Sequence, residues 1–256
     1  MTTQAEQILD SLVQMSLALG RPERDLAILG EGNTSAAVGD GSFWVKASGT
    51  QLPTASRQSF VRLWLEPVCA LADGGEMDDA AFKAALDATK VDPSDTRRSS
   101  TETVLHALAL TEFGAQYVGH THPVAVNAIM CSVVAEEAVS GRLFPDEIVV
   151  CGPAPAYVPY TDPGLPLAKK VREVCRRYLD DWGQPPKVIA MQNHGMIALG
   201  GSPQEVDSIT DMYVKTCRVL AGAYALGGPH FLSASNVDRI HTRPDEAYRR
   251  RELRLS

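Results

Sequence analysis

The chain has 256 residues, of which 45% are hydrophobic and 21% charged, a composition typical of a globular protein with one large domain or two small ones. Its net charge of -7 gives no general attraction to nucleic acid or to an anionic membrane, although a local basic patch could still bind an anion. We therefore expect neither a nucleic-acid-binding nor a membrane-surface protein.

The first part of the chain predicts a helix, a hairpin and two further helices. Thr3 and Glu6 form a capping-box signature, and apolar residues then recur at helical spacing as far as Gly20. From Leu29, a turn rich in Gly, Asn and Ser, a GDG turn and the apolar run 43–45 indicate a strand hairpin. Helical patterns return at 59–72 and 79–88, followed by a polar loop.

The rest of the chain predicts alternating helices and strands. Ser100 or Thr101 can cap a helix that runs to about residue 110, and Pro123 ends a strand at 116–122 because it removes a ladder donor. The remaining predicted elements are a helix at 124–134, a strand at 147–151, a proline-rich loop, a helix at 165–182, two strands flanking 193–195, and a helix at 202–226. No repeat or composition break marks a boundary, so residues 1–256 predict a single α/β domain.

The five cysteines are odd in number, widely spread and without C-x-x-C spacing. Neither a disulfide framework nor a cysteine zinc site is expected from such a pattern. The N-terminal segment has acidic residues and helical periodicity, and no apolar run approaches the ~18 residues of a membrane span. The sequence therefore predicts a cytoplasmic location, with neither a signal peptide nor a transmembrane segment.

The sequence GHTHP at 119–123 places two of the six histidines two positions apart. In an extended strand such residues project from the same face, so His120 and His122 can point at one spot, as metal ligands do. Two polar side chains on the solvent face of an antiparallel strand would give the same pattern. This motif alone leaves a metal site and an exposed polar pair as alternatives.

His194 lies between two apolar runs, directly before Gly195. The glycine lets the backbone take a positive φ angle, and the flanking runs would bury the turn. Such a histidine is commonly a hydrogen-bonded residue of a tight turn, but it needs a polar partner, which a metal held by His120 and His122 would supply. Three histidines with an open fourth position are a common ligand set of catalytic zinc sites.

Glu102 is the candidate acid or base. At helical spacing it shares a face with His106, four residues later. In the simpler interpretation Glu102 is an exposed glutamate that stabilises the helix dipole. Near a divalent cation, its carboxylate could bind the metal at rest and accept a substrate proton once displaced. His106 is then either an orienting partner or a histidine of the helix packing.

Three pairs of small residues indicate an anion site, because they offer backbone amides and hydroxyls without bulk. These pairs are Gly32 with Asn33, Ser48 with Gly49, and Ser100 with Thr101. Each pair alone is consistent with ordinary turn chemistry. Together they are compatible with a phosphate pocket, with Lys46 and Arg98 as nearby cations of unknown orientation.

In this order, GEGNTS, KASG, STE followed by His106, GHTHP and QNHG resemble the motifs of the class II aldolase/adducin family. The resemblance covers about residues 5–225 and leaves 226–256 as a C-terminal extension. It implies a single three-layer α/β/α domain with a central, mostly antiparallel sheet, assembled as a homotetramer with active sites at subunit interfaces. The adducin-like branch, which has lost catalysis, lacks the metal histidines, so their presence favours an enzyme over an interaction domain.

The resemblance also implies roles for individual residues. Glu102 matches the fourth metal ligand at rest and the catalytic acid/base. A tyrosine often protonates the aldehyde oxygen in this family, for which Tyr160 and Tyr157 are the candidates. The residues that match the zinc ligands are His120, His122 and His194. The residues that match the substrate-phosphate positions are Gly32, Asn33, Ser48, Gly49, Ser100 and Thr101.

The implied reaction is the reversible cleavage of a phosphorylated ketose to dihydroxyacetone phosphate and an aldehyde, through an enediolate that zinc stabilises. Mn²⁺, Co²⁺ or Fe²⁺ would suit the same nitrogen and oxygen ligands. Alternatives on the same metal site are a decarboxylase of a β-keto acid, a sugar-phosphate dehydratase and a sugar-phosphate 4-epimerase. The expected partner is thus a small sugar phosphate or keto acid.

Overall fold

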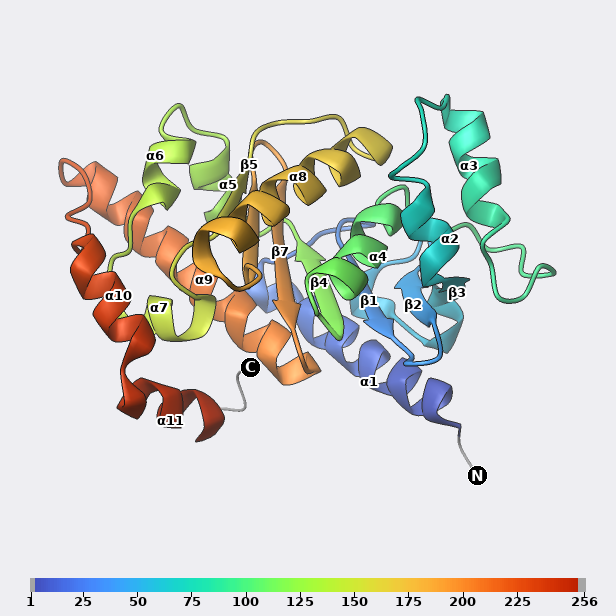
Figure 1. Cartoon of the computed structure of the whole chain (residues 1–256), viewed down its shortest axis with the longest axis horizontal. Coiled ribbons are helices and arrows are strands. Elements are labelled where there is room, and N and C mark those ends of the chain that lie inside the picture. The colour runs from blue at the N-terminus through green and yellow to red at the C-terminus, as the bar shows by residue number, and fades with distance from the viewer. Residues whose placement is uncertain (1–2, 253–256) are drawn as a thin grey trace.

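A central sheet of seven strands lies between two layers of helices (Figure 1). The computed structural model describes residues 3–252. The strand order is β3-β2-β1-β4-β7-β6-β5, and within the described chain all neighbouring strands pair antiparallel except β5 and β6. The three-layer α/β/α fold with a mostly antiparallel sheet is therefore confirmed.

The seven strands are short and are distributed over residues 33–200 of the chain. They are β1 (Asn33–Ala37), β2 (Ser42–Lys46), β3 (Phe60–Trp64), β4 (Tyr117–Thr121), β5 (Ala156–Val158), β6 (Val188–Met191) and β7 (Gly195–Gly200). β7 is the last of these seven described strands in sequence but lies inside the sheet, between β4 and β6. The centre of the sheet thus joins segments that are far apart in the chain.

Helices cover both faces of the sheet. The described α-helices are α1 (Gln4–Leu19), α2 (Leu65–Ala70), α3 (Asp79–Asp87), α4 (Thr103–Glu112), α5 (Val124–Met130), α6 (Ala135–Ser140), α7 (Pro145–Cys151), α8 (Leu165–Trp182), α9 (Pro203–Ala225), α10 (Ala234–Thr242) and α11 (Pro244–Glu252). α4 and α8 pack on one face, whereas α1, α5 and α9 pack on the other.

Alternation along β7 shows how one strand serves two cores. Ile197 and Leu199 contribute to the core under α4 and α8, whereas Met196 and Ala198 contribute to the core under α1 and α9. Successive side chains of a strand point to opposite faces, so an all-apolar strand is needed where both faces are covered. This explains why the run MIALG in β7 carries no polar residue.

Many predicted elements are confirmed. The capping box of Thr3 and Glu6 starts α1, and Gly20 follows its last residue. The hairpin of β1 and β2, the long helices α8 and α9, and the strand pair β6 and β7 also occur where the sequence predicted them. The helix predicted at 79–88 is α3.

Four predictions were wrong, three of them in part. The segment 59–72 begins as strand β3 and turns helical only at Leu65, and the helix predicted at 124–134 is two helices, α5 and α6. The segment 147–151 is helical, not a strand, because Pro145 starts α7 and Asp146 lies in its first turn. Its buried valines fit a strand or a buried helix equally well. The proline-rich loop contains the short strand β5.

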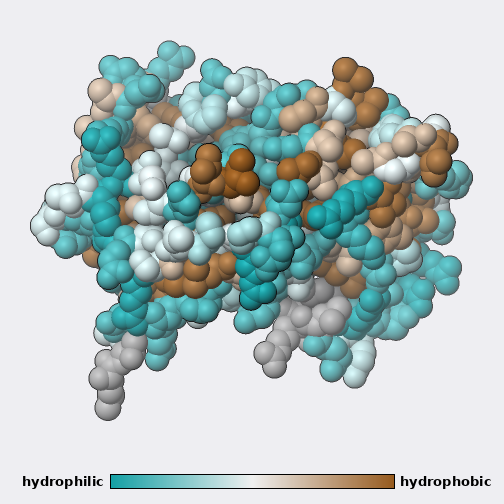
Figure 2. Space-filling model, turned by 180° about the vertical axis from the view of Figure 1, so that it is seen from behind, coloured by the Kyte–Doolittle hydropathy of each residue, from teal (hydrophilic) through white to brown (hydrophobic). Residues whose placement is uncertain are grey.

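The C-terminal helices continue the fold past residue 226. α10 and α11 pack against α7, and the amide of Leu232 donates to the carbonyl oxygen of Arg142 at 2.8 Å. Residues 253–256 of the predicted extension lie outside the described residues. Within residues 3–252, every helix is too short or too polar for a membrane crossing. Figure 2 shows apolar side chains in several separate clusters on the face opposite to that of Figure 1.

Candidate metal centre and substrate site

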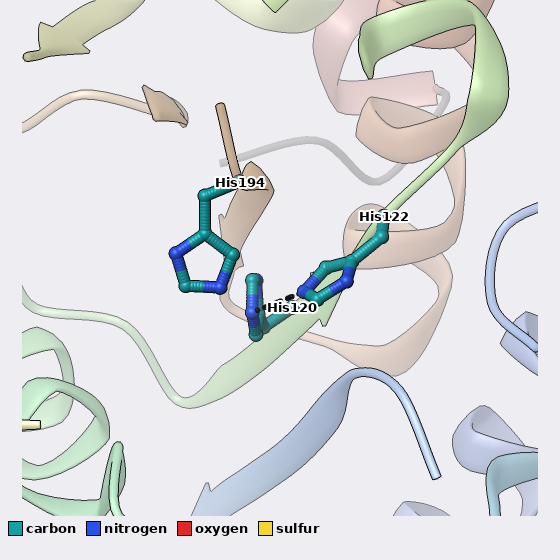
Figure 3. Close-up of side chains that lie close together, drawn as sticks. All are labelled: His120, His122 and His194. Atoms are coloured by element: carbon teal, nitrogen blue, oxygen red, sulfur yellow. Dashed lines mark hydrogen bonds between the residues drawn. The ribbon is translucent and has the colours of Figure 1, made fainter. Parts of the chain in front are cut away.

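His120 and His122 lie side by side at the end of β4, in the middle of the sheet (Figure 3). Their Nε2 atoms are 3.0 Å apart, and His120 is only 1% exposed. Nδ1 of His120 donates to the carbonyl oxygen of Met196 at 2.9 Å, which leaves its Nε2 lone pair free for a ligand. The interpretation of these histidines as an exposed polar pair therefore does not fit the structure.

His194 reaches the same point from the turn between β6 and β7. Its ring centroid lies 5.0 Å from that of His120 and 4.9 Å from that of His122. The positive φ of this turn is taken by Asn193, at +53°, and not by Gly195 as the sequence suggested. Glycine is needed at 195 for a different reason, because a Cβ there would come within 2.5 Å of the Thr121 carbonyl oxygen.

The three imidazoles form a cluster that suits a divalent metal ion. One nitrogen of each ring lies within 4.8 Å of the others. Burial lowers the pKa of His122 to about 3 and also lowers the pKa of His120, so both rings are neutral and can donate lone pairs. Neutral imidazoles around one point are typical ligands of zinc and related ions.

The Glu102 carboxylate lies next to two of the three histidines. It lies at the N-terminus of α4, but its side chain makes no capping hydrogen bond to that helix. Its Oε1 is 3.2 Å from Nε2 of His194, and its Oε2 is 3.5 Å from Nε2 of His120. Burial would raise the pKa of Glu102, but His120, His194 and the hydrogen bond from Asn33 together hold it well below its usual range. The carboxylate is thus ionised and directed at the histidines.

The three small-residue loops meet beside this cluster. The amide of Ser48 donates to the carbonyl oxygen of Arg98 at 2.8 Å, and Nδ2 of Asn33 lies 3.2 Å from Oγ of Ser100. Gly32 has a φ of +66°, and a Cβ there would come within 2.6 Å of the His120 carbonyl oxygen. The sequence pairs therefore form one continuous rim, although the Ser48 amide is already used and cannot bind an anion.

The Lys46 side chain contacts two of these loops from the protein interior. Its side chain is buried, and Nζ donates to the carbonyl oxygen of Thr50 at 2.6 Å and approaches that of Gly30 at 3.5 Å. Burial lowers the pKa of Lys46, which the nearby Glu102 carboxylate partly offsets. The lysine therefore fixes loops 30–33 and 47–50 and places a cation under the rim.

Most of the chain matches one known family. Residues 10–221 match the family described as Class II Aldolase and Adducin N-terminal domain. The chain belongs to this family. It is also 29% identical over 199 residues to a Bacillus subtilis (strain 168) protein named "Uncharacterized oxidoreductase YuxG", a match that covers 75% of this chain but spans only 26% of that relative.

Solved structures share the fold of this class II aldolase/adducin domain. The N-terminal class II aldolase domain of a conserved protein from Thermoplasma acidophilum is 25% identical, with a TM-score of 0.66, and the match covers 83% of this chain and 93% of that one. An L-fuculose 1-phosphate aldolase from Glaciozyma antarctica PI12 is 14% identical, with a TM-score of 0.62, and the match covers 94% of this chain and 84% of that one.

The structure directs neither tyrosine candidate of the class II aldolase/adducin domain at the cluster. Tyr160 is 56% exposed, and its hydroxyl donates to Oδ1 of Asp162 at 3.1 Å. Its backbone amide donates to the side chain of Gln192, two residues before His194. Tyr157 packs partly buried against the core under α1 and α9. Tyr160 is therefore near the site in the chain path, but its hydroxyl has another partner.

The sequence analysis predicts no role for two residues that lie at the site, Glu31 and Ser35. Oε1 of Glu31 is 3.9 Å from Nδ1 of His122, on the ring edge that faces away from His120. Oγ of Ser35 is 2.7 Å from Nδ1 of His106. The two-residue spacing could have indicated Ser35, because it lies two residues after Asn33 on β1 and shares its face.

An open hollow of about 350 Å³ adjoins His122 and Glu31.

Proposed function

We propose that this chain is a metal-dependent aldolase that reversibly cleaves a phosphorylated ketose to dihydroxyacetone phosphate and an aldehyde. One observation carries the proposal: three histidines and the Glu102 carboxylate converge beside a rim of three small-residue loops. Membership of the class II aldolase/adducin family supports it, as does the shared fold with an L-fuculose 1-phosphate aldolase. The histidines weigh against a purely interacting, adducin-like domain.

The metal would be held by His120, His122, His194 and, at rest, Glu102. We propose zinc, for which three nitrogen ligands and one oxygen ligand are suitable, while Mn²⁺, Co²⁺ and Fe²⁺ suit the same set. When bound, the ion supplies Lewis-acid stabilisation of the negative charge that carbon–carbon cleavage leaves on the three-carbon product.

Two side chains of this protein, Glu102 and Tyr160, are proposed to transfer protons during the reaction. Glu102 is the proposed acid/base: in the cleavage direction it returns a proton to the carbanion-like carbon, and in the synthetic direction it removes that proton. Its low pKa keeps it ionised and ready to act as the base. In the synthetic direction Tyr160 is the proposed proton donor to the aldehyde oxygen, for which its hydroxyl would have to leave Asp162. In the cleavage direction the deprotonated Tyr160 would accept the proton of the ketose hydroxyl as the carbon–carbon bond breaks, protonated Glu102 would give its proton to the carbon, and exchange with solvent would return both groups to their starting states.

The substrate phosphate is proposed to lie against the rim of small residues. The groups that would bind it come from Gly32, Asn33, Ser48, Gly49, Ser100 and Thr101. Ser48 and Thr101 are exposed, so their hydroxyls can reach a ligand, and the buried Lys46 ammonium adds favourable charge. The aldehyde part would then extend from the metal toward the hollow beside His122.

The test is a panel of ketose 1-phosphates given to the zinc-loaded full chain. We expect dihydroxyacetone phosphate to form in proportion to the ketose consumed, with the matching unphosphorylated ketoses as controls that react much more slowly. Three other outcomes would contradict the aldolase. Release of carbon dioxide from β-keto acids would identify a decarboxylase, loss of water would identify a dehydratase, and an epimerised sugar without dihydroxyacetone phosphate would identify an epimerase.

We also propose that residues 1–256 form one domain that assembles as a homotetramer with shared active sites. Ile28 and Val124, which line the hollow beside His122, are 62% and 61% exposed, and the adjacent Leu29 is 74% exposed. Exposed apolar side chains around a site are typical of surfaces that a partner covers. Light scattering should give four times the chain mass of 27.6 kDa; a monomer would contradict this.

Five unpaired cysteines are consistent with the proposed cytoplasmic location.

A further inference from the structure

His106 is a buried histidine of α4 that the proposed reaction does not use. It is 0% exposed and lies one helical turn after Glu102. Its Nδ1 is 2.7 Å from Oγ of Ser35, and its Nε2 is in hydrogen-bond contact with Oδ1 of Asn33. Asn33 in turn donates from Nδ2 to Oε2 of Glu102 at 2.7 Å. A continuous chain of hydrogen bonds therefore leads from His106 to the Glu102 carboxylate.

The direction of each hydrogen bond in this chain follows from the carboxylate. Because ionised Glu102 only accepts, Asn33 must present its NH₂ group to it and its oxygen to His106. An amide oxygen also only accepts, so Nε2 of His106 carries the hydrogen and Nδ1 accepts from the Ser35 hydroxyl. The ring is fully buried and each of its two nitrogens has one partner, so a single proton on Nε2 satisfies both contacts.

We propose that His106 is a positioning residue, whose Nε2–H holds the Asn33 amide so that its NH₂ group fixes Oε2 of Glu102. Without this donor, the Asn33 side chain can rotate and turn its oxygen toward the carboxylate, which then loses a fixed partner. The role rests on the proposed function, because Glu102 acts as acid/base only there. A histidine that merely fills space in the helix packing would need neither a defined tautomer nor a donor at Nε2.

The first test reads the hydrogen bonds without any turnover. In the zinc-loaded full chain labelled with ¹⁵N, we expect the nitrogen shifts of His106 to report the neutral Nε2–H tautomer. The Asn33 side-chain amide signals should shift in His106→Leu, stay close to wild type in His106→Gln, which keeps a donor, and stay close to wild type in Leu108→Ala. Leu108 is a matched control, because it is buried in the same helix and removing it destabilises the packing.

An Nδ1–H tautomer, or Asn33 signals that shift as much in Leu108→Ala as in His106→Leu, would overturn the proposal. These results are independent of the reaction, so they decide the role of His106 in holding Asn33 even if no ketose phosphate is cleaved. Absence of turnover by the wild-type chain would count against the proposed function instead.

The second test connects the positioning to the reaction through a double-mutant cycle. We expect His106→Leu to lower kcat by roughly 10- to 100-fold with little change in KM, as is typical when the partner that orients an active-site group is removed. His106→Gln should restore most of the loss. In an Asn33→Ala background, adding His106→Leu should lower kcat by no more than about 3-fold, because residues acting through one another are not additive. Equal losses in both backgrounds would overturn the proposal.

Discussion

The carbonyl oxygen of Met196 accepts a hydrogen bond from Nδ1 of His120 at 2.9 Å, across the pairing of β4 with β7. Because Met196 follows Gly195 directly, the strand that begins beside His194 also selects the free nitrogen of His120. The sheet thus fixes both the place and the tautomer of a candidate ligand.

Metal binding should depend on the histidine cluster. Protein purified without added metal should carry about one divalent ion per chain by elemental analysis, and His120→Ala and His194→Ala should lose most of it, because each removes one of three nitrogen ligands. His230→Ala is the matched control, since His230 is exposed and outside the cluster. Full metal content in the cluster variants would contradict the site.

Glu102→Gln should separate proton transfer from metal binding. The amide keeps the shape of the side chain but cannot exchange the proton, so we expect kcat to fall by about 10²- to 10⁴-fold while the three histidines retain the metal. Turnover and elemental analysis on the same preparation check this. Undiminished turnover would assign the acid/base role to another group.

Gly195→Ala should damage the cluster without removing a ligand. The new Cβ would meet the Thr121 carbonyl oxygen at 2.5 Å and Cδ2 of His122 at 2.8 Å, so β4 and the His194 turn must separate. We expect weaker metal binding in a chelator competition and a lower melting temperature. In Gly75→Ala the Cβ meets no atom within 4 Å, and both quantities should stay near wild type.

Lys46→Met should weaken binding of the substrate anion more than it slows the reaction. The change removes the cation under the rim and the hydrogen bond to Thr50, so we expect KM for a ketose phosphate to rise about 10-fold, equivalent to ~1.4 kcal/mol, with a smaller effect on kcat. Lys90→Met is the control, because Lys90 is also buried but bonds to Asp95, away from the rim. An unchanged KM would contradict this role.

Stability of the chelator-treated chain should fall in acid. The pKa of His106 drops from 6.5 in the unfolded chain to about 3 on folding, as does that of His122, because burial disfavours the charged ring. Between these values the unfolded chain binds more protons, so the free energy of unfolding decreases as the pH falls, by up to ~1.4 kcal/mol per pH unit for each group. The depressed pKa of Glu102 acts in the same direction below its ordinary value of 4.5.

Denaturant unfolding between pH 7 and 4.5 measures this slope. His106→Leu should flatten it by removing one of the groups. A slope that is the same in wild type and His106→Leu would show that His106 is not held neutral.

The parts of the site that depend on local periodicity could be predicted from the sequence. A two-residue spacing placed His120 and His122 together on β4, and a four-residue spacing placed Glu102 and His106 on one face of α4. The alternative that His106 only packs in the helix remained open, because its contacts to β1 come from residues about 70 positions earlier, which no local pattern reports.

The parts that depend on tertiary contacts could not be predicted. Periodicity cannot distinguish a strand from a buried helix in the run that became α7, since both bury every side chain. The sequence indicates a constrained backbone at Gly195, but the constraint is the approach of Thr121, which only the packed sheet reveals. The sequence also predicts a free amide at Ser48, which in the fold donates to the Arg98 carbonyl oxygen.

The position of β7 has a consequence for the order of events during synthesis. His120 and Met196 are separated by 76 residues, and β7 is the last of the seven strands of this sheet to be synthesised although it lies inside it. Until β7 inserts between β4 and β6, only two of the three clustered imidazoles are adjacent. If the proposed ion requires all three, its tight binding requires the completed sheet, and slow pairing of distant strands would set the earliest time at which it binds.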